Sequence, residues 1–317
     1  MRIARILAAV VVMVTVGFLV TYGAGGLKPG EGYVEVPGGR VWYRVVGEGT
    51  GTPLLVLHGG SGVPSYYLKP LAGIGVDRPV VFYDQLGCGH SDKISDTSLF
   101  TIDHYLKELA AVRRALGLNE VDIYGHSWGA MLAVDYMLTK PDGVRALVLA
   151  SPSLDMERWV RDADSLLTTL PDSVQEVITE HEEAGTTDAP EYQQAMMLFY
   201  QMYLARKQPW SADIDSSFAQ MNPQIYQYMF GPSEFTITGT MRTYNRDDRL
   251  GEITVPTLFT AGEFDEARPS TVKYFQSLMP GSKLEIFPGC GHLTMQDDSA
   301  SYVDSLRKFL RTADETQ

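Results

Sequence analysis

The sequence contains few of the residues from which metal sites, disulfide frameworks and nucleic-acid interfaces are built. Its 317 residues include two cysteines and six histidines, with no closely spaced cysteine pair and no His-x-x-x-His pattern. Because zinc sites usually depend on such spacings, neither a metal nor an organic cofactor is indicated. Positive charge is also scarce: 26 lysines and arginines face 39 acidic residues, a formal net charge of −13 at pH 7. That balance argues against nucleic acid and anionic lipid as partners.

Both cysteines lie in glycine-rich turns. Cys88 follows Gly87, and Cys290 precedes Gly291. A protein exported to an oxidising compartment could pair them, but a small side chain that fits a tight turn is the favoured interpretation. We therefore expect two free thiols.

The first 25 residues differ in character from the rest of the chain. Arg2 and Arg5 precede an uncharged and strongly apolar stretch over residues 6–20. A positive start followed by a short apolar run is typical of a secretory signal or of a short uncleaved membrane anchor. A buried helix of the core is the alternative, and cleavage stays open. We expect residues 1–25 to direct export or membrane anchoring, and the protein to be extracytoplasmic.

From residue 33 onward the pattern predicts an α/β protein. Two alternating segments, Tyr33–Pro37 and Arg40–Val46, predict an antiparallel hairpin with Gly38 and Gly39 at its turn. Later apolar runs alternate with helical segments such as 102–116, which predicts a mostly parallel sheet. The strands expected after the hairpin are 54–57, 80–83, 121–124, 145–150, 257–261 and 283–287.

The strand pattern is interrupted in the second half of the chain. Residues 171–184, 190–206 and 211–221 are expected to form helices instead. A helical insertion between late strands of such a sheet is typical of a cap above a binding site. We therefore predict a core over residues 33–153 and 250–317, with a helical cap over residues 154–249.

One serine is placed as a nucleophile would be. Ser127 lies inside a Gly-x-Ser-x-Gly pattern, residues 125–129, after a strand-like run and before a helix-like one. Small residues two positions to either side allow a sharp turn that exposes the hydroxyl, and the helix start favours negative charge there. The pattern alone is weak evidence, since glycine and serine are common.

A second glycine loop supplies what an acyl-transfer site needs. His58 and the glycines Gly59, Gly60 and Gly62 follow the strand 54–57 directly. A loop at a strand end can turn a backbone amide toward a developing oxyanion. We prefer Gly60 to Gly59 as this donor, and expect the amide of Trp128, the residue after the serine, to be the second donor.

The other members of a triad should follow in the order acid, then histidine. Asp265 and His292 each lie just after a predicted strand, where an open parallel sheet gathers its active site. Glu263 is the rival acid, but it comes earlier in the turn. Among the other histidines, His58 and His126 are interpreted as loop-shaping, His90 as structural, and His104 and His181 as lying on solvated helix faces.

Six motifs together resemble those of the proline iminopeptidases, which are α/β-hydrolases that remove an N-terminal residue, often proline. The branch typified by the tricorn-interacting aminopeptidase, whose specificity is broader, is the most similar. The resemblance covers residues 33–310. The motifs are HGGSG (58–62), YDQLGCGHS (83–91), GHSWG (125–129), GPSEFTITGT (231–240), GEFDE (262–266) and GHLTM (291–295).

The resemblance implies roles for two acidic residues. Members of this family hold the free ammonium of the substrate with carboxylates, which match Glu234 and Glu266 in this sequence. From the residues alone, a solvated cap glutamate and a helix-start acid would be the simpler interpretation. Gly59 is expected to contact the substrate through the backbone. Two departures from the family pattern are Ser61 in place of proline and Leu86 in place of arginine, and the second argues against strict proline specificity.

The sequence thus predicts a capped α/β-hydrolase that releases N-terminal residues from short peptides with a free N-terminus, through an acyl-enzyme on Ser127. Alternatives on the same scaffold are an amino-acid amidase or arylamidase, and an esterase that would not need the two glutamates. A catalytically silent receptor for small molecules is the remote alternative, although it would not need an intact triad.

Overall fold

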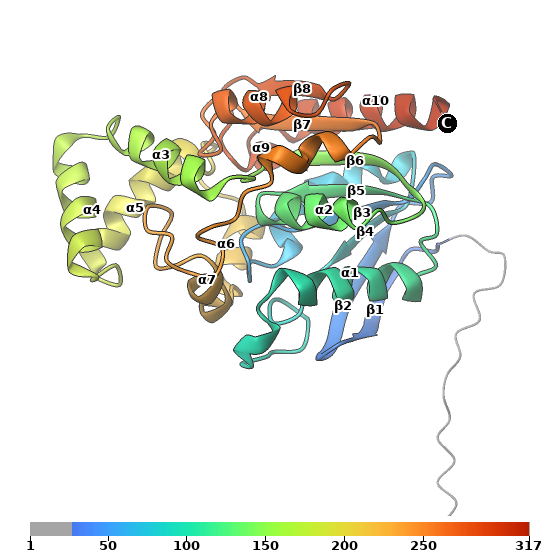
Figure 1. Cartoon of the computed structure of the whole chain (residues 1–317), viewed down its shortest axis with the longest axis horizontal. Helices are drawn as coiled ribbons and strands as arrows, with labels where there is room; N and C mark the ends of the chain where they lie inside the picture. The colour runs from blue at the N-terminus through green and yellow to red at the C-terminus, as the bar shows by residue number, and fades with distance from the viewer. Residues whose placement is uncertain (1–26, 317) are drawn as a thin grey trace, which may run out of the picture.

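The computed structural model describes residues 27–316 (Figure 1). The leader predicted over residues 1–25 lies outside them. Among the helices formed between residues 27 and 316, none is both long and apolar enough to cross a membrane. The described chain forms a mostly parallel sheet covered by helices, with further helices extending to one side (Figure 1).

The sheet begins with the predicted hairpin. Strand β1 (Gly30–Val36) pairs antiparallel with β2 (Gly39–Val46), and Val36 lies opposite Gly39. Strand β2 pairs antiparallel with β4, whereas every later pair is parallel, in the order β1-β2-β4-β3-β5-β6-β7-β8. The other strands are β3 (Leu54–Leu57), β4 (Val80–Tyr83), β5 (Val121–His126), β6 (Val144–Ala150), β7 (Thr257–Gly262) and β8 (Lys283–Phe287). All predicted strands are confirmed: β1 begins three residues earlier than predicted, and every other strand end lies within two residues of the predicted one.

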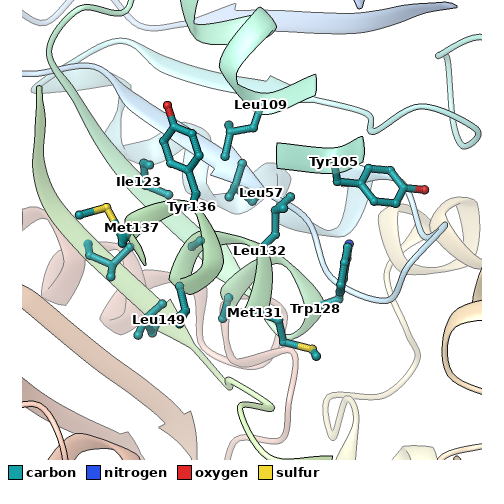
Figure 2. Close-up of a cluster of buried hydrophobic side chains, with 14 of the residues drawn as sticks. Leu57, Tyr105, Leu109, Ile123, Trp128, Met131, Leu132, Tyr136, Met137 and Leu149 are labelled. Atoms are coloured by element: carbon teal, nitrogen blue, oxygen red, sulfur yellow. The ribbon is translucent and has the colours of Figure 1, made fainter. Parts of the chain in front are cut away.

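The central strands are almost wholly apolar because helices cover both faces of the sheet. On one face, α1 (Ile102–Ala115), α2 (Trp128–Leu138) and α8 (Pro269–Ser277) contribute to one buried cluster, part of which is drawn in Figure 2. On the other face, the 3-10 helix η1 (Ser65–Val76) and α10 (Ser299–Glu315) contribute to a second. The short helices of the core are η2 (Thr97–Leu99), η3 (Asp247–Glu252) and α9 (Thr294–Asp297).

Five α-helices lie between β6 and β7 and form the cap. They are α3 (Met156–Leu167), α4 (Asp172–Ala184), α5 (Pro190–Tyr203), α6 (Ala212–Ala219) and α7 (Pro223–Met229). Part of the cap has its own apolar cluster, which includes Ile178, Phe199 and Phe235. The chain enters and leaves the insertion at neighbouring points, where Asp155 and Asn245 form an isolated bridge. The domain boundaries at residues 154 and 249 stay a prediction.

Two sequence-based expectations about helices need correction. Helices α3 and α7 were not among the predicted segments, and both begin at a side-chain cap: Asp155 accepts from the amides of Glu157 and Arg158, and Asn222 accepts from that of Gln224. His104 was expected on a solvated face but is buried, 6% exposed, with its ring against Tyr105 of the same helix. The first turn of α1 therefore faces the core.

Candidate active site

Ser127 occupies a sharp turn between β5 and α2. Its backbone has φ 53° and ψ −118°, outside the conformations that most residues adopt. The turn depends on its flanking glycines, since a Cβ on Gly125 would lie 2.3 Å from the Gly129 oxygen, and one on Gly129 would lie 2.2 Å from the Leu57 oxygen. The predicted turn is confirmed, and it leaves the serine partly exposed at the wall of a cavity.

Asp265 orients the imidazole of His292. Its Oδ1 accepts hydrogen bonds from His292 Nδ1 at 2.7 Å and from the Ala267 amide at 2.8 Å. Its Oδ2 accepts from the Ser151 hydroxyl at 2.6 Å and the Gly262 amide at 3.1 Å. Because a carboxylate can only accept, Nδ1 carries the proton in the neutral imidazole and Nε2 is left as the basic atom. The structure brings the predicted acid and histidine together.

Hydrogen bonds to the first two peptide groups of the oxyanion loop, His58–Gly59 and Gly59–Gly60, hold its backbone in place. The Gly59 amide donates to the Tyr67 hydroxyl at 2.6 Å, so its proton is already used and is not available to an oxyanion. The His58 carbonyl accepts from Gln85 Nε2 at 3.2 Å, and the Gly59 carbonyl accepts from His58 Nδ1 at 3.1 Å. The Gly59 carbonyl and the Gly60 N–H belong to one trans peptide group, in which C=O and N–H point in opposite directions. Because this carbonyl points toward the His58 ring, the Gly60 N–H points away from that ring.

Gln85 also connects the two predicted oxyanion donors. Its Oε1 accepts from the Trp128 indole at 2.9 Å, while its amide group holds the loop that ends in Gly60. Trp128 is the first residue of α2, and the first N–H groups of a helix have no partner within the helix. Gly60 and Trp128 both line the cavity. Gly59 lines it too, and a role in substrate contact stays a prediction.

The cavity lies between the sheet edge and the cap and has a volume of about 760 Å³. Ser127 and His292 line it together with both predicted glutamates. The cap supplies most of the remaining wall, which is rich in aromatic and methionine side chains. These residues include Trp159, Tyr192, Met196, Met197, Tyr200, Trp210, Phe218, Tyr226 and Phe230. The cap wall is therefore mainly aromatic and methionine-lined, with polar residues such as Glu234 among them, and Ser127 lies on the core side of the cavity.

The two glutamates line this cavity from different parts of the fold, one from the cap and one from the core. Glu234 comes from the cap loop after α7, where its carboxylate accepts a hydrogen bond from the Tyr226 hydroxyl. Glu266 follows Asp265 in the core and is 5% exposed, and its Oε2 is buried without a hydrogen-bond partner among residues 27–316. An unpartnered buried carboxylate oxygen is costly, so a cation at this position would stabilise the site.

The charges of the site act on one another. Burial raises the pKa of Glu266 above its usual value, and the nearby Glu234 and Asp265 raise it further, while His292 opposes the shift. Burial likewise raises the pKa of Glu234. Burial alone would lower the pKa of His292, but Asp265 and Glu266 raise it above its usual value. Three carboxylates thus surround one imidazole, and the site favours additional positive charge.

Comparison with known proteins decides the family. Residues 52–299 match the α/β-hydrolase fold model. A proline iminopeptidase of Heyndrickxia coagulans is 44% identical over 286 residues, covering 89% of this chain and 99% of that protein. The chain belongs to the proline iminopeptidase family of α/β-hydrolases. A second relative, the proline iminopeptidase of Saccharolobus solfataricus, is 34% identical over 88% of this chain and 92% of its own length.

Solved structures of the same fold agree with this family assignment. The crystal structure of proline iminopeptidase from Mycobacterium smegmatis superimposes with a TM-score of 0.85 at 32% identity, covering 90% of this chain and 99% of that one. The crystal structure of VinJ gives a TM-score of 0.87 at 34% identity, covering 90% of this chain and 100% of its own. The predicted capped α/β-hydrolase fold is confirmed.

Glu263, His126 and the two cysteines have structural surroundings that account for them without a catalytic role. Glu263 is exposed and accepts a hydrogen bond from the Gly289 amide at 2.9 Å. His126 shapes the loops as expected: its Nε2 bonds the His292 carbonyl at 3.0 Å and its Nδ1 bonds the Tyr67 hydroxyl at 2.9 Å. Cys88 and Cys290 are free and buried, as predicted.

Three residues of the site were not predicted from the sequence. Ser151 donates its hydroxyl proton to Asp265 at 2.6 Å, and the same oxygen lies 3.2 Å from the His292 carbonyl. Its φ of 46°, at the end of β6, is a conformation that a serine seldom adopts and that no motif announces. Tyr226 lies in the unpredicted α7, and Trp159 lies in the unpredicted α3. Only the packing of the cap brings these two aromatic residues to the cavity.

Proposed function

We propose that the protein is a serine aminopeptidase that releases N-terminal residues, proline among them, from short peptides. The observation that carries the proposal is the pair Glu234 and Glu266, which face the cavity beside His292. A peptide with a free N-terminus brings an ammonium that would pair with both carboxylates. An N-blocked peptide would leave them without a charge partner, and losing one partner of a buried charge pair typically costs about 2–5 kcal/mol.

The proposed chemistry follows the usual order of serine hydrolases. Ser127 Oγ attacks the first carbonyl carbon of the peptide while His292 Nε2 takes its proton. The negative charge that forms on the carbonyl oxygen is held by the amides of Gly60 and Trp128. His292 then gives the proton to the departing amine, and the C–N bond breaks. Water next attacks the acyl-enzyme with the same histidine as base, and the free amino acid leaves.

Asp265 keeps the imidazole in the tautomer that this sequence of steps requires. Its contact with Nδ1 at 2.7 Å leaves Nε2 unprotonated for the attack and stabilises the imidazolium that follows. The names of the related proline iminopeptidases support proline as a first residue. The cavity of about 760 Å³ has room for more than one residue, which supports peptides over amino-acid amides as substrates.

We also propose, from the sequence alone, that residues 1–25 export the protein or tether it to a membrane. Two arginines before a run of apolar residues support this proposal. Expression of the full chain in a bacterial host, followed by fractionation and N-terminal sequencing, tests it. An intact N-terminus recovered in the soluble cytoplasmic fraction would be incompatible with either route.

The function is tested with peptides whose first residue is proline, alanine or leucine. Mass spectrometry should detect the free first residue after incubation with the wild-type protein and none after incubation with Ser127→Ala. Circular dichroism of the variant verifies that it is folded. A wild-type protein that leaves all these peptides intact, or a folded Ser127→Ala protein that retains activity, contradicts the proposal.

A further inference from the structure

The loop that carries His292 is attached directly to the cap. The His292 amide donates to the Tyr203 carbonyl at 2.8 Å, and the Leu293 amide donates to the Leu204 carbonyl at 2.7 Å. Tyr203 is the last residue of α5, so the end of a cap helix runs beside the histidine loop. The approach is close: a Cβ on Gly291 would lie 2.8 Å from the Tyr203 oxygen.

One carboxylate bridges these two segments. Asp297, the last residue of α9, accepts through Oδ1 from the backbone amides of Arg206 at 2.9 Å and Lys207 at 2.8 Å. Its Oδ2 accepts from the Gly291 amide, the residue before His292, at 2.8 Å. All three partners are donors, so only a group with two acceptor oxygens can satisfy them together.

The same cap helix also touches the space that substrate occupies. Met196 and Tyr200 line the cavity, and Tyr200 lies one helical turn before Tyr203. A substrate that presses on Tyr200 therefore acts on the helix whose end holds the histidine loop. Any shift of α5 would reach His292 through the two backbone hydrogen bonds and through Asp297.

We propose that Asp297 is a positioning residue, which fixes His292 relative to Ser127 by bonding the histidine loop to the end of cap helix α5. The inference rests on the proposed function, because its test measures turnover at Ser127. Asp297 is not expected to contact the substrate, since it binds three backbone amides and acts only through the loop.

The variant Asp297→Asn tests this with little change in shape. The asparagine side chain offers one acceptor oxygen and one NH2 group. In either orientation, its NH2 group therefore faces at least one backbone N–H that Asp297 accepts from. Other contacts at the junction remain, including the Ser211 hydroxyl on Gln296 at 2.8 Å and the Arg206 side chain on the carbonyls of Gly289 and Met202. The variant is therefore expected to fold.

The matched control is Asp298→Asn, one residue further on. Asp298 Oδ1 accepts from the Ser301 amide at 3.1 Å and caps α10, away from the histidine loop. Both variants remove one negative charge from the same turn. For a prolyl anilide, Asp297→Asn should lower kcat by about 10²-fold, the loss that a small misplacement of a reacting group can cause, with KM changed little. Asp298→Asn should leave both constants within about twofold.

A second readout reports on the histidine itself. The proton shared by His292 Nδ1 and Asp265 should give a low-field resonance in the proton spectrum, and its titration should follow His292. Asp297→Asn should shift or broaden this resonance, and Asp298→Asn should not. If Asp297→Asn does not fold, Asp297→Glu replaces it: the charge is kept but the longer side chain misplaces the acceptors, and kcat should again fall.

The outcomes separate this inference from the proposed function. If the wild-type protein does not hydrolyse the anilide, the proposed function fails. If the wild-type protein is active and a folded Asp297 variant keeps its kcat and its low-field resonance, only the positioning role is overturned. Equal losses in Asp297→Asn and Asp298→Asn would overturn it as well, because they would reflect charge alone.

Discussion

The Nε2 atom of His292 lies 3.7 Å from Oε1 of Glu266. In the proposed mechanism, the atom that takes the proton of Ser127 is thus adjacent to a carboxylate of the proposed ammonium site. Catalytic base and substrate recognition are therefore electrostatically linked. A carboxylate favours the imidazolium, whereas an ammonium bound to that carboxylate disfavours it.

This contact predicts a different pH dependence for the free and the substrate-bound enzyme. In the free enzyme, Asp265 and Glu266 raise the pKa of His292 above its usual value, so activity is lost as pH falls through that raised pKa. In the complex, the ammonium of the substrate opposes protonation and lowers the pKa. The acidic limb of kcat should therefore lie at lower pH than that of kcat/KM for a prolyl anilide.

A substrate without an amine provides the control. With a simple acetate ester, the acidic limbs of kcat and kcat/KM should nearly coincide. Glu266→Gln removes one of the charges that raise the pKa of His292, so the kcat/KM limb for this ester should move to lower pH. A limb that stays in place in Glu266→Gln would show that the two groups are not coupled.

Removing either carboxylate should lower kcat/KM for substrates with a free amine. Glu234→Gln and Glu266→Gln are each expected to reduce kcat/KM for a prolyl anilide by about 10²-fold, as expected when one partner of a buried charge pair is lost. Hydrolysis of acetate esters should change far less. Glu263→Gln is the matched control, because Glu263 is exposed. Comparable losses on ester and anilide would argue for a structural role of the glutamates.

Ser151 is expected to hold Asp265 in the orientation that the triad needs. Ser151→Ala removes the hydroxyl that donates to Asp265 at 2.6 Å and also lies 3.2 Å from the His292 carbonyl. Because hydrogen bonds to charged groups contribute about 1.5–3 kcal/mol, kcat should fall about tenfold or more, with KM nearly unchanged. The control is Ser153→Ala, a buried serine whose hydroxyl contacts Met131 Sδ at 3.4 Å. Steady-state kinetics on both variants decide between a triad role and general packing.

Gln85 should matter to stability and turnover together. Gln85→Leu leaves the His58 carbonyl and the Trp128 indole buried without this partner. Each such group typically costs about 1–3 kcal/mol, which denaturant unfolding can measure. If the amides of Gly60 and Trp128 are held less rigidly, kcat should fall for the ester and the anilide alike. A stable variant with unchanged kcat would show that the loop keeps its position without Gln85.

The sequence predicted the core well because its patterns are local. Runs such as residues 54–57 are apolar throughout, which is typical of a strand buried on both faces. The turn around Ser127 was predictable for a similar reason, since Gly125 and Gly129 are imposed by close backbone contacts. The order of acid and histidine after later strands then located Asp265 and His292.

The cap side of the site depends on contacts that no local pattern encodes. Trp159 and Tyr226 reach the cavity only because two separate cap helices pack over the same sheet edge. His104 was misplaced because its polar neighbours along α1 suggested a solvated face, whereas tertiary packing turns it inward. Glu234 was found through the family resemblance, since a lone cap glutamate carries no signal of its own.

The most direct test of the account compares a prolyl anilide with its N-acetylated form on the wild-type protein. Acetylation removes the ammonium and leaves the scissile bond unchanged, so only the charge recognised by Glu234 and Glu266 differs. We predict a kcat/KM at least about 10²-fold higher for the free amine. Equal kcat/KM values for the two substrates would contradict it.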